Sequence, residues 1–422
     1  MQLNPEWVAQ QGEDAMLLHS VDVAFPAVSE GLVGIAVSGG GDSMALLHLF
    51  ARWSGRTGHP IAAVTVDHGL RAESRAEADS VAAYCVQAGI PHDILTWHGK
   101  RARGNLSAAA RDARYSLMAE WAASKGIAQI ALGHTADDSA ENFLMRLGRS
   151  AGVDGLAEMQ TRFERSGILW ARPLWQQSRA ALRDYLRRHD VHWDEDPSNE
   201  DLRYLRTRAR KALPVLEDLG VTAQTIQASA FALREAQAAL VHYARQEAQL
   251  HVTQEAGDLM IPERPMPPIP AEIERRLLTA ALQWVGSNDY PPRGIWSGLL
   301  DVDVAGQQRK TIAGCLILKR KGQFRITREY NAVKDLVTAT DALWDTRWRL
   351  EGPHAPDLEV RALGEAVGQL PDWRETGLPR PALTSSPSVW RGDMLVAAPL
   401  AGYNREWTAQ IVADFTSFLV SH

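Results

Sequence analysis

Short apolar segments alternate with helical periodicity through the first half of the chain. Four segments have the length and composition of buried strands: 33–37, 61–66, 94–97 and 127–132. Helical spacing of apolar residues predicts helices after them, over 44–52, 76–88, 106–125 and 136–147. Because strands that alternate with helices form a parallel sheet covered on both faces, this half is predicted to be an α/β domain.

The pattern changes beyond about residue 216. A long helical stretch is predicted over 221–254, and the prolines between Pro262 and Pro270 would form a semi-rigid connector. Helical periodicity returns over 271–284, and 311–327 predicts a hairpin. The predicted domains are an α/β domain over 1–216, a helical region ending in a hairpin over 217–330, and a small β-leaning module over 331–422.

The composition is that of a globular protein without a membrane span. Of 422 residues, 45% are hydrophobic and 23% charged, and no apolar run reaches about 18 residues. No signal peptide is evident, and two cysteines cannot make a disulfide framework, so we expect a cytoplasmic protein. The net charge of -6 argues against a generally basic coat, so RNA would need local basic patches.

The loop after the first predicted strand has the residues of an anion site. It consists of Ser38, Gly39, Gly40, Gly41, Asp42 and Ser43. Glycines let the backbone approach an anion closely, and the first N–H groups of the following helix are unpaired and partly positive. Without a lysine the loop is not the nucleoside-triphosphate P-loop, and its glycine spacing is not that of dinucleotide-binding proteins. The alternative is a glycine-rich turn that only joins strand to helix.

Two later loops would open at the same edge of a parallel sheet. The first holds Asp67 and His68, which would lie beside a nucleotide or serve as a helix cap and a surface imidazole. The second begins with Gly133 and His134, and the imidazole would donate to a phosphate.

Three carboxylates follow in that second loop and its helix: Asp137, Asp138 and Glu141. Their spacing puts them near the helix N-terminus, where acids also complement the helix dipole. Acids so close to phosphates would repel them unless they bound Mg²⁺ or a cationic substrate. Because the cluster lies at the ligand edge of the sheet, we predict a functional role for it.

Basic residues gather in three segments that are candidates for RNA contact. They are Lys100, Arg101, Arg103, Arg111 and Arg114; Arg203, Arg206, Arg208, Arg210 and Lys211; and Lys319, Arg320, Lys321, Arg325 and Arg328. The second group could instead be a solvated helix face paired with Glu200 and Asp201. A base presented to an enzyme is normally extruded from its stack, and Tyr115 or Trp175 would offer it an aromatic platform.

The chain resembles the tRNA(Ile)-lysidine synthetases of the PP-loop ATP-pyrophosphatase superfamily. The matching segments occur in the family's order: 38–43, 67–71, Asn105 with 110–115, 133–141, 147–156, 172–174, 196–199 and 204–210. The first segment alone indicates only the superfamily, whereas 147–156 and the Asp-Pro-Ser-Asn of 196–199 indicate the family. Four positions depart from the common pattern without removing a phosphate donor: Gly41, Asp67, Thr135 and Thr207.

The resemblance implies a PP-loop fold and a two-step ligation. ATP would adenylate the C2 carbonyl oxygen of the wobble cytidine in a tRNA(Ile) with a CAU anticodon. The ε-amine of free L-lysine would then displace AMP, giving lysidine and changing codon and amino-acid specificity from methionine to isoleucine. The partners would be this tRNA and lysine, with no membrane, and the protein would be a monomer or homodimer.

The predicted roles follow from the loops and the resemblance together. ATP would bind at 38–43 with His68, Arg111 and Gly133, and Asp42 would hold Mg²⁺. The predicted catalytic residues are Asp42, His134, Asp137 and Asp138. The predicted lysine contacts are Asp137, Asp138 and Glu141. The predicted tRNA contacts are Arg101, Arg103, Arg114, Arg206, Arg208 and Arg210. The resemblance also implies that 1–216 is the catalytic domain, that 217–330 binds tRNA or acts as a linker, and that 331–422 is a tRNA-binding module.

Two other functions fit parts of the pattern. Another ATP-pyrophosphatase, such as a tRNA 2-thiolation enzyme or an ammonia-using amide synthetase, would share the phosphate loop. Thiolation needs reactive cysteines, and Cys85 and Cys315 lie in no ligand loop. An amide synthetase needs a glutaminase partner or domain, for which no signature is evident. A non-catalytic nucleotide- or RNA-binding module would not need an intact phosphate loop beside three acids.

Overall fold

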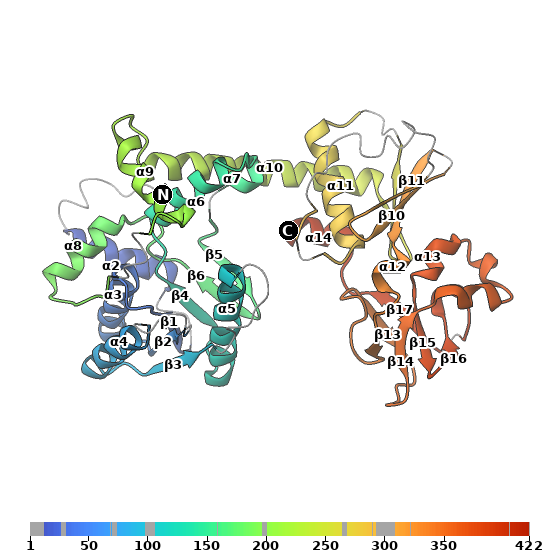
Figure 1. Ribbon diagram of the computed structural model, residues 1–422, viewed down its shortest axis with the longest axis horizontal. Helices are drawn as coiled ribbons and strands as arrows, with labels where there is room; N and C mark the ends of the chain where they lie inside the picture. Colours follow the sequence, from blue (N-terminus) through green and yellow to red (C-terminus); the bar gives the residue numbers. More distant parts are fainter. Residues whose placement is uncertain are drawn as a thin grey trace. The chain divides into compact units, whose positions relative to one another are not determined.

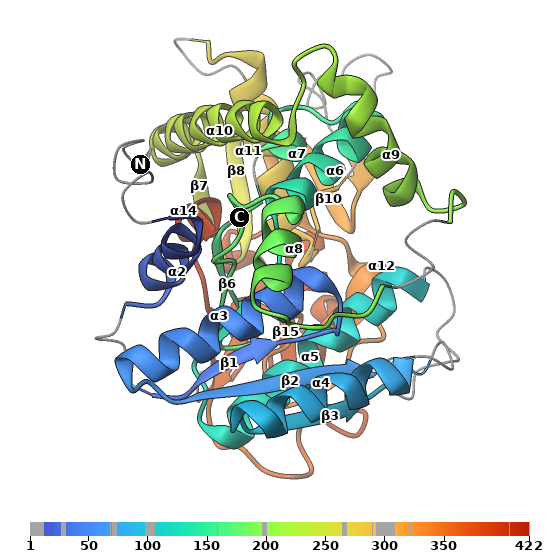
Figure 2. The same ribbon diagram turned by 90° about the vertical axis from the view of Figure 1, so that its left-hand side faces the viewer.

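The chain folds into two compact units, Met1–Gln237 and Ala238–His422. The computed structural model describes residues 12–26, 31–67, 69, 74–97, 106–157, 159–195, 201–263, 268–288, 290–292, 309–320, 322–404 and 406–421 (Figures 1 and 2). The boundary falls within helix α10 (Ala223–His251). The domain boundaries predicted at residues 216 and 330 stay predictions. No helix in the described ranges has both the length and the apolar character needed to cross a membrane.

Unit 1 is an α/β structure. Its strands are β1 (Val33–Ala36), β2 (Ile61–Asp67), β3 (His92–Thr96), β4 (Gln129–Leu132), β5 (Arg162–Arg165) and β6 (Ile168–Ala171). Its other helices are α2 (Glu13–Ala24), α3 (Gly41–Thr57), α4 (Ser74–Ala88), α5 (Leu106–Lys125), α6 (Ala136–Leu147), α7 (Val153–Leu156), α8 (Arg179–Arg188) and α9 (Leu205–Glu217). The predicted α/β fold is confirmed.

The strands form one sheet in the order β3-β2-β1-β4-β6-β5. All neighbours pair in parallel except β5 and β6, which form an antiparallel edge. Val33 of β1 pairs with Ile61 of β2 on one side and Gln129 of β4 on the other, so the three strands begin at the same level. Strands β1 and β4 end together at Ala36 and Leu132, and β2 runs on in the same direction to Asp67. The loops after them therefore emerge together, as the argument from parallel topology requires.

Apolar cores on both faces of this sheet fix the helices that carry the loops. On one face α3 and α8 pack together through fully buried residues such as Phe50, Trp53 and Leu182. On the other face α5 covers the strands through Met118 and Trp121. Figure 2 views unit 1 from the side of α3, α4 and α8, with α5 behind the strands. Both faces of β1, β2 and β4 are thus buried, which explains why these strands read as continuous apolar runs.

Unit 2 contains helices and antiparallel strands. Its helices are α11 (Ala271–Val285), α12 (Tyr330–Val333), α13 (Arg380–Thr384) and α14 (Phe415–Ser421). Its strands are β7 (Thr253–Glu255), β8 (Asp258–Pro262), β9 (Arg309–Ile312), β10 (Cys315–Arg320), β11 (Gln323–Arg328), β12 (Thr338–Ala339), β13 (Trp348–Glu351), β14 (Glu359–Ala362), β15 (Pro387–Arg391), β16 (Met394–Ala397) and β17 (Thr408–Ile411). The sheet orders are β7-β8-β11-β10-β9, β12-β14-β15-β16 and β13-β17.

The predicted hairpin over 311–327 is present as β10 and β11, and β9 and β8 extend it on either side. A buried arginine joins this part of unit 2 to the C-terminal part. Arg347 is 7% exposed, and its guanidinium donates to the carbonyls of Trp284, Val285 and Gly257. The helical region and the β-leaning region thus share a buried polar contact inside one compact unit.

Candidate active site

A cleft of about 1000 Å³ opens at the carboxyl edge of the parallel sheet in unit 1. Its wall combines the ends of β1, β2 and β4, the N-terminus of α3, and side chains from α5, α8 and α9. The residues singled out in the sequence that line it are Ser38, Gly40, Gly41, Asp42, Ser43, Arg114, Gly133, His134, Asp138, Arg206, Arg210 and Lys211. Segments that are far apart in sequence therefore meet where ligands of such sheets bind.

The phosphate loop, residues 38–43, is held in shape by its own hydrogen bonds. The Ser43 hydroxyl accepts from the Ser38 N–H at 3.1 Å and donates to the Gly40 carbonyl at 2.9 Å. Gly39 has a φ of 87°, in the left-handed region that favours glycine. Helix α3 begins directly after Gly40, so the N–H groups of Gly41 and Asp42 have no acceptor within the helix, and both residues line the cleft. An anion here would meet these donors and the positive end of the helix dipole.

Gly133 lets the end of β4 lie directly against this loop. A Cβ atom at Gly133 would lie 3.1 Å from the carbonyl oxygen of Asp42 and from the Cα of Ser43. Both neighbours are backbone atoms, so a larger residue would push the loop out of position. Gly41 is under less constraint, because a Cβ there would lie 3.4 Å from the Trp193 ring, an ordinary contact.

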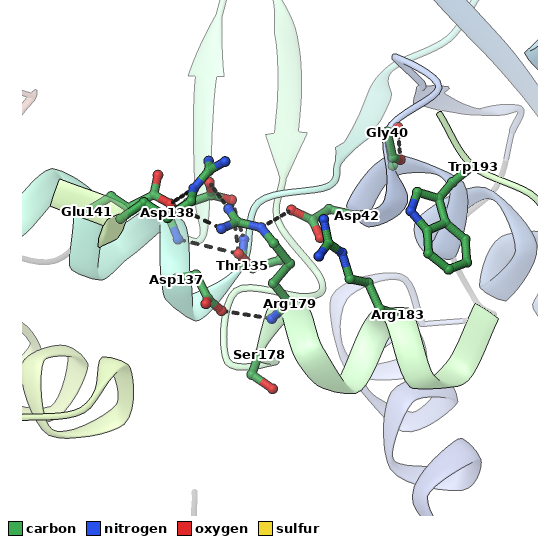
Figure 3. Close-up of polar contacts among 12 residues, drawn as sticks. Gly40, Asp42, Thr135, Asp137, Asp138, Glu141, Ser178, Arg179, Arg183 and Trp193 are labelled. Carbon is green, nitrogen blue, oxygen red and sulfur yellow. Dashed lines mark hydrogen bonds and ion pairs between the residues drawn. The ribbon is translucent and has the colours of Figure 1, made fainter. Parts of the chain in front are cut away.

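Arg179, the first residue of α8, connects the phosphate loop with the acidic cluster (Figure 3). Its Nε donates to Asp42 at 3.1 Å, its Nη1 to Glu141 at 3.1 Å and its Nη2 to Asp138 at 3.2 Å. Its backbone N–H also donates to Asp137 at 2.7 Å. One guanidinium therefore bridges carboxylates from α3 and α6, through three different nitrogen atoms.

Two arginines from α9 complete the charge balance of the cluster. Arg206 donates to Asp138 and to Glu141, each at 2.7 Å. Arg210 donates to Glu141 at 2.7 Å. The Glu141 side chain is fully buried beneath these contacts. The cations that the acids require are thus supplied by the chain itself.

The three predicted lysine-binding acids occupy different positions. Asp138 lines the cleft, and its carboxylate also accepts from the backbone N–H of Thr135, completing a capping box at the start of α6. Glu141 is buried behind the arginines. Asp137 accepts from the first N–H of α8 and is not among the residues that line the cleft. The capping alternative therefore describes part of what Asp137 and Asp138 do.

Burial and the arginines set the charge state of these acids. Burial alone would raise the pKa of Asp138, but Arg206 and Arg179 outweigh it and lower that pKa below its ordinary value. Glu141 behaves likewise, with Arg210 contributing most to the lowering of its pKa. Both carboxylates are therefore ionised at neutral pH.

Asp42 differs from the other acids. Burial raises its pKa, and Arg179 offsets only part of that rise. Its Oδ1 atom is buried, and no residue within the described ranges donates a hydrogen bond to it. An unsatisfied carboxylate oxygen beside an anion-binding loop fits Mg²⁺, which binds through one or two carboxylates plus phosphates and water. Across the described ranges, no cluster of three or more metal-ligating side chains occurs, so the remaining ligands would come from phosphates and water.

His134 is held neutral with a defined tautomer. Arg172 Nε donates to His134 Nδ1 at 3.1 Å, so the ring proton lies on Nε2. Burial, followed by the charge of Arg172, lowers the pKa of His134 to about 3. The imidazole therefore offers the cleft an N–H donor whose protonation does not change near neutral pH.

The remaining predicted ATP and tRNA contacts differ in whether they line the cleft. Arg114 lines the cleft, whereas Arg111 has an exposed side chain over the Tyr115 ring and is not among the lining residues. Asp67 accepts from the Gly69 N–H at 2.8 Å, as a turn residue does. His68, Arg101 and Arg103 lie outside the described residues.

The basic groups are divided by the structure. Arg206 and Arg210 point into the cleft, while Arg208 between them is exposed. In the hairpin, Arg325 pairs with Asp258, and Arg328 pairs with Asp345. Much of the third basic group is therefore neutralised within unit 2.

The sequence reasoning missed the contribution of α8 and the segment after it. Arg179, Arg183, Asp194 and Glu195 all line the cleft. The backbone N–H of Asp194 donates to the Gly39 carbonyl at 3.0 Å, so this segment supports the phosphate loop. The only local signal was Ser178 as a helix N-cap before an arginine, and it does not reveal a partner on another element.

Comparisons with known proteins show which family the chain is similar to. The PP-loop domain family matches residues 16–216. A tRNA(Ile)-lysidine synthase of Ruegeria pomeroyi is 45% identical over 410 residues, covering 96% of this chain and 98% of that protein. One from Wolbachia pipientis wMel is 35% identical over 325 residues, 75% of each chain. Among solved structures, the U34-tRNA thiolase NcsA of Methanococcus maripaludis aligns with a TM-score of 0.46 and 15% identity, covering 53% of this chain and 79% of that one.

Proposed function

The chain belongs to the tRNA(Ile)-lysidine synthase family, and from this membership we propose how its cleft divides the reaction among its residues. It is an ATP-using ligase that acts on tRNA(Ile). The bond formed is between C2 of the wobble cytidine and the ε-amine of L-lysine, through an adenylated base. The observation that carries this proposal is the 45% identity over nearly the whole chain, with the matched loops gathered at one cleft.

The phosphate loop binds the pyrophosphate that leaves in the first step. The cytidine carbonyl oxygen attacks the α-phosphorus, the bond to the β-phosphate bridging oxygen breaks, and negative charge grows on the leaving group. The N–H groups at the start of α3 are already oriented toward that position, so they stabilise the charge without reorganisation. Magnesium held by Asp42 would neutralise phosphate charge.

His134 and Arg114 act on the α-phosphate. The His134 Nε2–H is a neutral donor, and its tautomer is fixed by Arg172. Arg114 adds a guanidinium to the same wall of the cleft. Together they would stabilise the equatorial oxygens during transfer of AMP.

Arg179 is a positioning residue for this step. It fixes one Asp42 oxygen and leaves the other, Oδ1, without a donor among the described residues. One Asp42 oxygen is therefore bound to Arg179, and the other is left for a cation beside the phosphate loop. Arg179 also shields ATP from the combined charge of Asp138 and Glu141.

Asp138 is the acid best placed to contact lysine. It alone of the three predicted lysine contacts lines the cleft, while Glu141 holds the arginines and Asp137 caps α8. The amine must approach C2 of the adenylated base as AMP leaves, so the lysine site and the α-phosphate must face one cavity. Asp138 and His134 satisfy this requirement.

A thiolation reaction finds no support in the cleft. Burial raises the pKa of Cys85 to about 11 and that of Cys315 to about 12, and neither residue lines the cavity. Low-pKa, accessible thiols are what sulfur transfer requires.

The direct test is mass analysis of an unmodified tRNA(Ile) transcript with a CAU anticodon after incubation with ATP, Mg²⁺ and lysine. The expected result is one nucleoside, the wobble cytidine, that is heavier by one lysine residue. Omitting lysine should leave pyrophosphate release without the modified nucleoside, and a CAU-anticodon methionine tRNA is the matched control. Pyrophosphate release without any mass change in complete reactions would refute the ligase assignment.

A further inference from the structure

The outer face of α9 is the surface that we propose receives the anticodon loop of the tRNA. This proposal rests on the proposed function. The nucleotides that flank the target base would lie on four side chains, which form a stripe on one side of the helix: Tyr204, Arg208, Lys211 and Val215.

Helical geometry separates this stripe from Arg206 and Arg210, the α9 arginines that bind the acidic cluster. Arg206, Arg210 and Leu213 are spaced four and three residues apart and face α6 and the cleft. The stripe has the same spacing on the other side of the helix, and its members are exposed: Tyr204 is 54% and Val215 is 68% exposed. The helix therefore turns one set of cations inward to the acids and leaves another set at the surface.

The chemistry of the stripe matches single-stranded RNA. In the ranges that the structure describes, neither Arg208 nor Lys211 belongs to an ion pair, so both charges are available to phosphates. Tyr204 precedes them by one helical turn and offers an exposed ring, on which a base can stack. A protein partner would favour apolar contacts over cations, whereas this surface combines two cations and one aromatic ring with a single aliphatic side chain, Val215.

The position of the stripe supports the same occupant. Lys211 belongs both to the stripe and to the lining of the cleft, so the stripe reaches the cleft mouth. An extruded wobble base would enter the cleft while the neighbouring nucleotides remain on α9. Tyr115 cannot provide this platform, because it is 5% exposed and packs edge-on against Trp170.

The test compares Tyr204→Ala, Tyr204→Phe and Arg208→Ala for binding of unmodified tRNA(Ile) across a salt series. Tyr204→Ala should weaken binding roughly tenfold with an unchanged salt slope, because stacking does not release counterions. Tyr204→Phe should retain wild-type affinity. Arg208→Ala should weaken binding several-fold and reduce the salt slope by about one.

Lys125→Ala is the matched control, because it removes an exposed cation at the opposite edge of the sheet, where Lys125 pairs with Asp93. It should bind like wild type. The KM for ATP should be the same in all four variants. A variant that disturbed the cleft itself would change this KM. Wild-type affinity and slope in both alanine variants would overturn the proposal. If the wild-type enzyme modified the tRNA in the same preparation, the proposed function would still stand.

Discussion

Replacing Arg179 tests whether the phosphate loop and the acidic cluster work as one unit. In Arg179→Gln, Asp42 loses the one guanidinium that donates to it among the described residues. Asp138 and Glu141 keep Arg206 and Arg210, so most of the damage should fall on the ATP side of the cleft.

The magnitude follows from the geometry of the lost pair. Arg179 Nε lies 3.1 Å from Asp42, and the two side chains are 15% and 21% exposed. An ion pair at this separation is worth about 5 kcal/mol at an effective dielectric constant of about 20. The cleft is open to water, so we halve this figure to about 2.5 kcal/mol, which corresponds to roughly a 70-fold fall in kcat/KM for ATP.

Arg179→Lys separates charge from geometry. The guanidinium uses three nitrogen atoms for three carboxylates, whereas an ammonium group is a single point of charge. Lysine should therefore recover part of the lost rate but not all of it. The assay is pyrophosphate release at varied ATP, with tRNA(Ile) and lysine saturating. Arg187→Gln is the control, because it makes the same change two turns further along α8, in an exposed pair with Asp184.

Protection of the buried Cys85 thiol from a maleimide reports whether each variant keeps unit 1 folded. The reasoning is refuted if the folded Arg179→Gln enzyme has the ATP dependence of Arg187→Gln. A change confined to the KM for lysine would also contradict it, because that result would place Arg179 in the second step only.

Three further outcomes are expected. Asp42→Asn should lower pyrophosphate release at least 100-fold while tRNA affinity stays within about twofold, as measured by filter binding, because the anion loop rather than the RNA surface is changed. Burial lowers the pKa of His48 from 6.5 to about 4, so the folded state favours neutral His48, and stability should fall as pH drops through this window. Between about pH 7 and pH 5 the wild type should lose about 1 kcal/mol more than His48→Gln, as read from Cys85 labelling in urea; equal losses would contradict this. Arg347→Met leaves three buried carbonyls without a donor and should cost unit 2 about 3 kcal/mol, exposing Cys315 at lower urea while Cys85 labelling is unchanged.

The sequence predicted elements best where their signals are local. Helix α6 was predicted over the range that it occupies, because a regular apolar spacing marks it, and in the structure a capping box between Thr135 and Asp138 fixes its start. The antiparallel edge made by β5 and β6 was missed, because the glycine between these short strands did not stand out from other turns. Helix α2 was missed because only Leu17 and Val21 of its twelve residues are buried, which leaves a weak periodic signal.

The phosphate loop was predictable, but its partners were not. A glycine run between an apolar strand and a helix predicts an anion-binding site from six consecutive residues. Arg179 lies 137 positions from Asp42, and nothing local to α8 indicates which acid it binds. The order and direction of the strands decide which distant side chains meet, so long-range ion pairs can be predicted only when the topology is known.

The acidic cluster needs cations, as the sequence predicted, but the structure supplies them from a source that was not predicted. Acids beside phosphates do require cations, yet here Arg179, Arg206 and Arg210 supply them instead of the substrate. A lysine that enters next to Asp138 therefore meets two guanidiniums as well as one carboxylate. Asp42, Asp138 and Glu141 are matched by Arg179, Arg206 and Arg210, so a bound lysine would meet no unpaired carboxylate that holds it as an ammonium ion. Because only the neutral amine carries the lone pair that attacks C2, this pairing would favour the second step as well as shield the first.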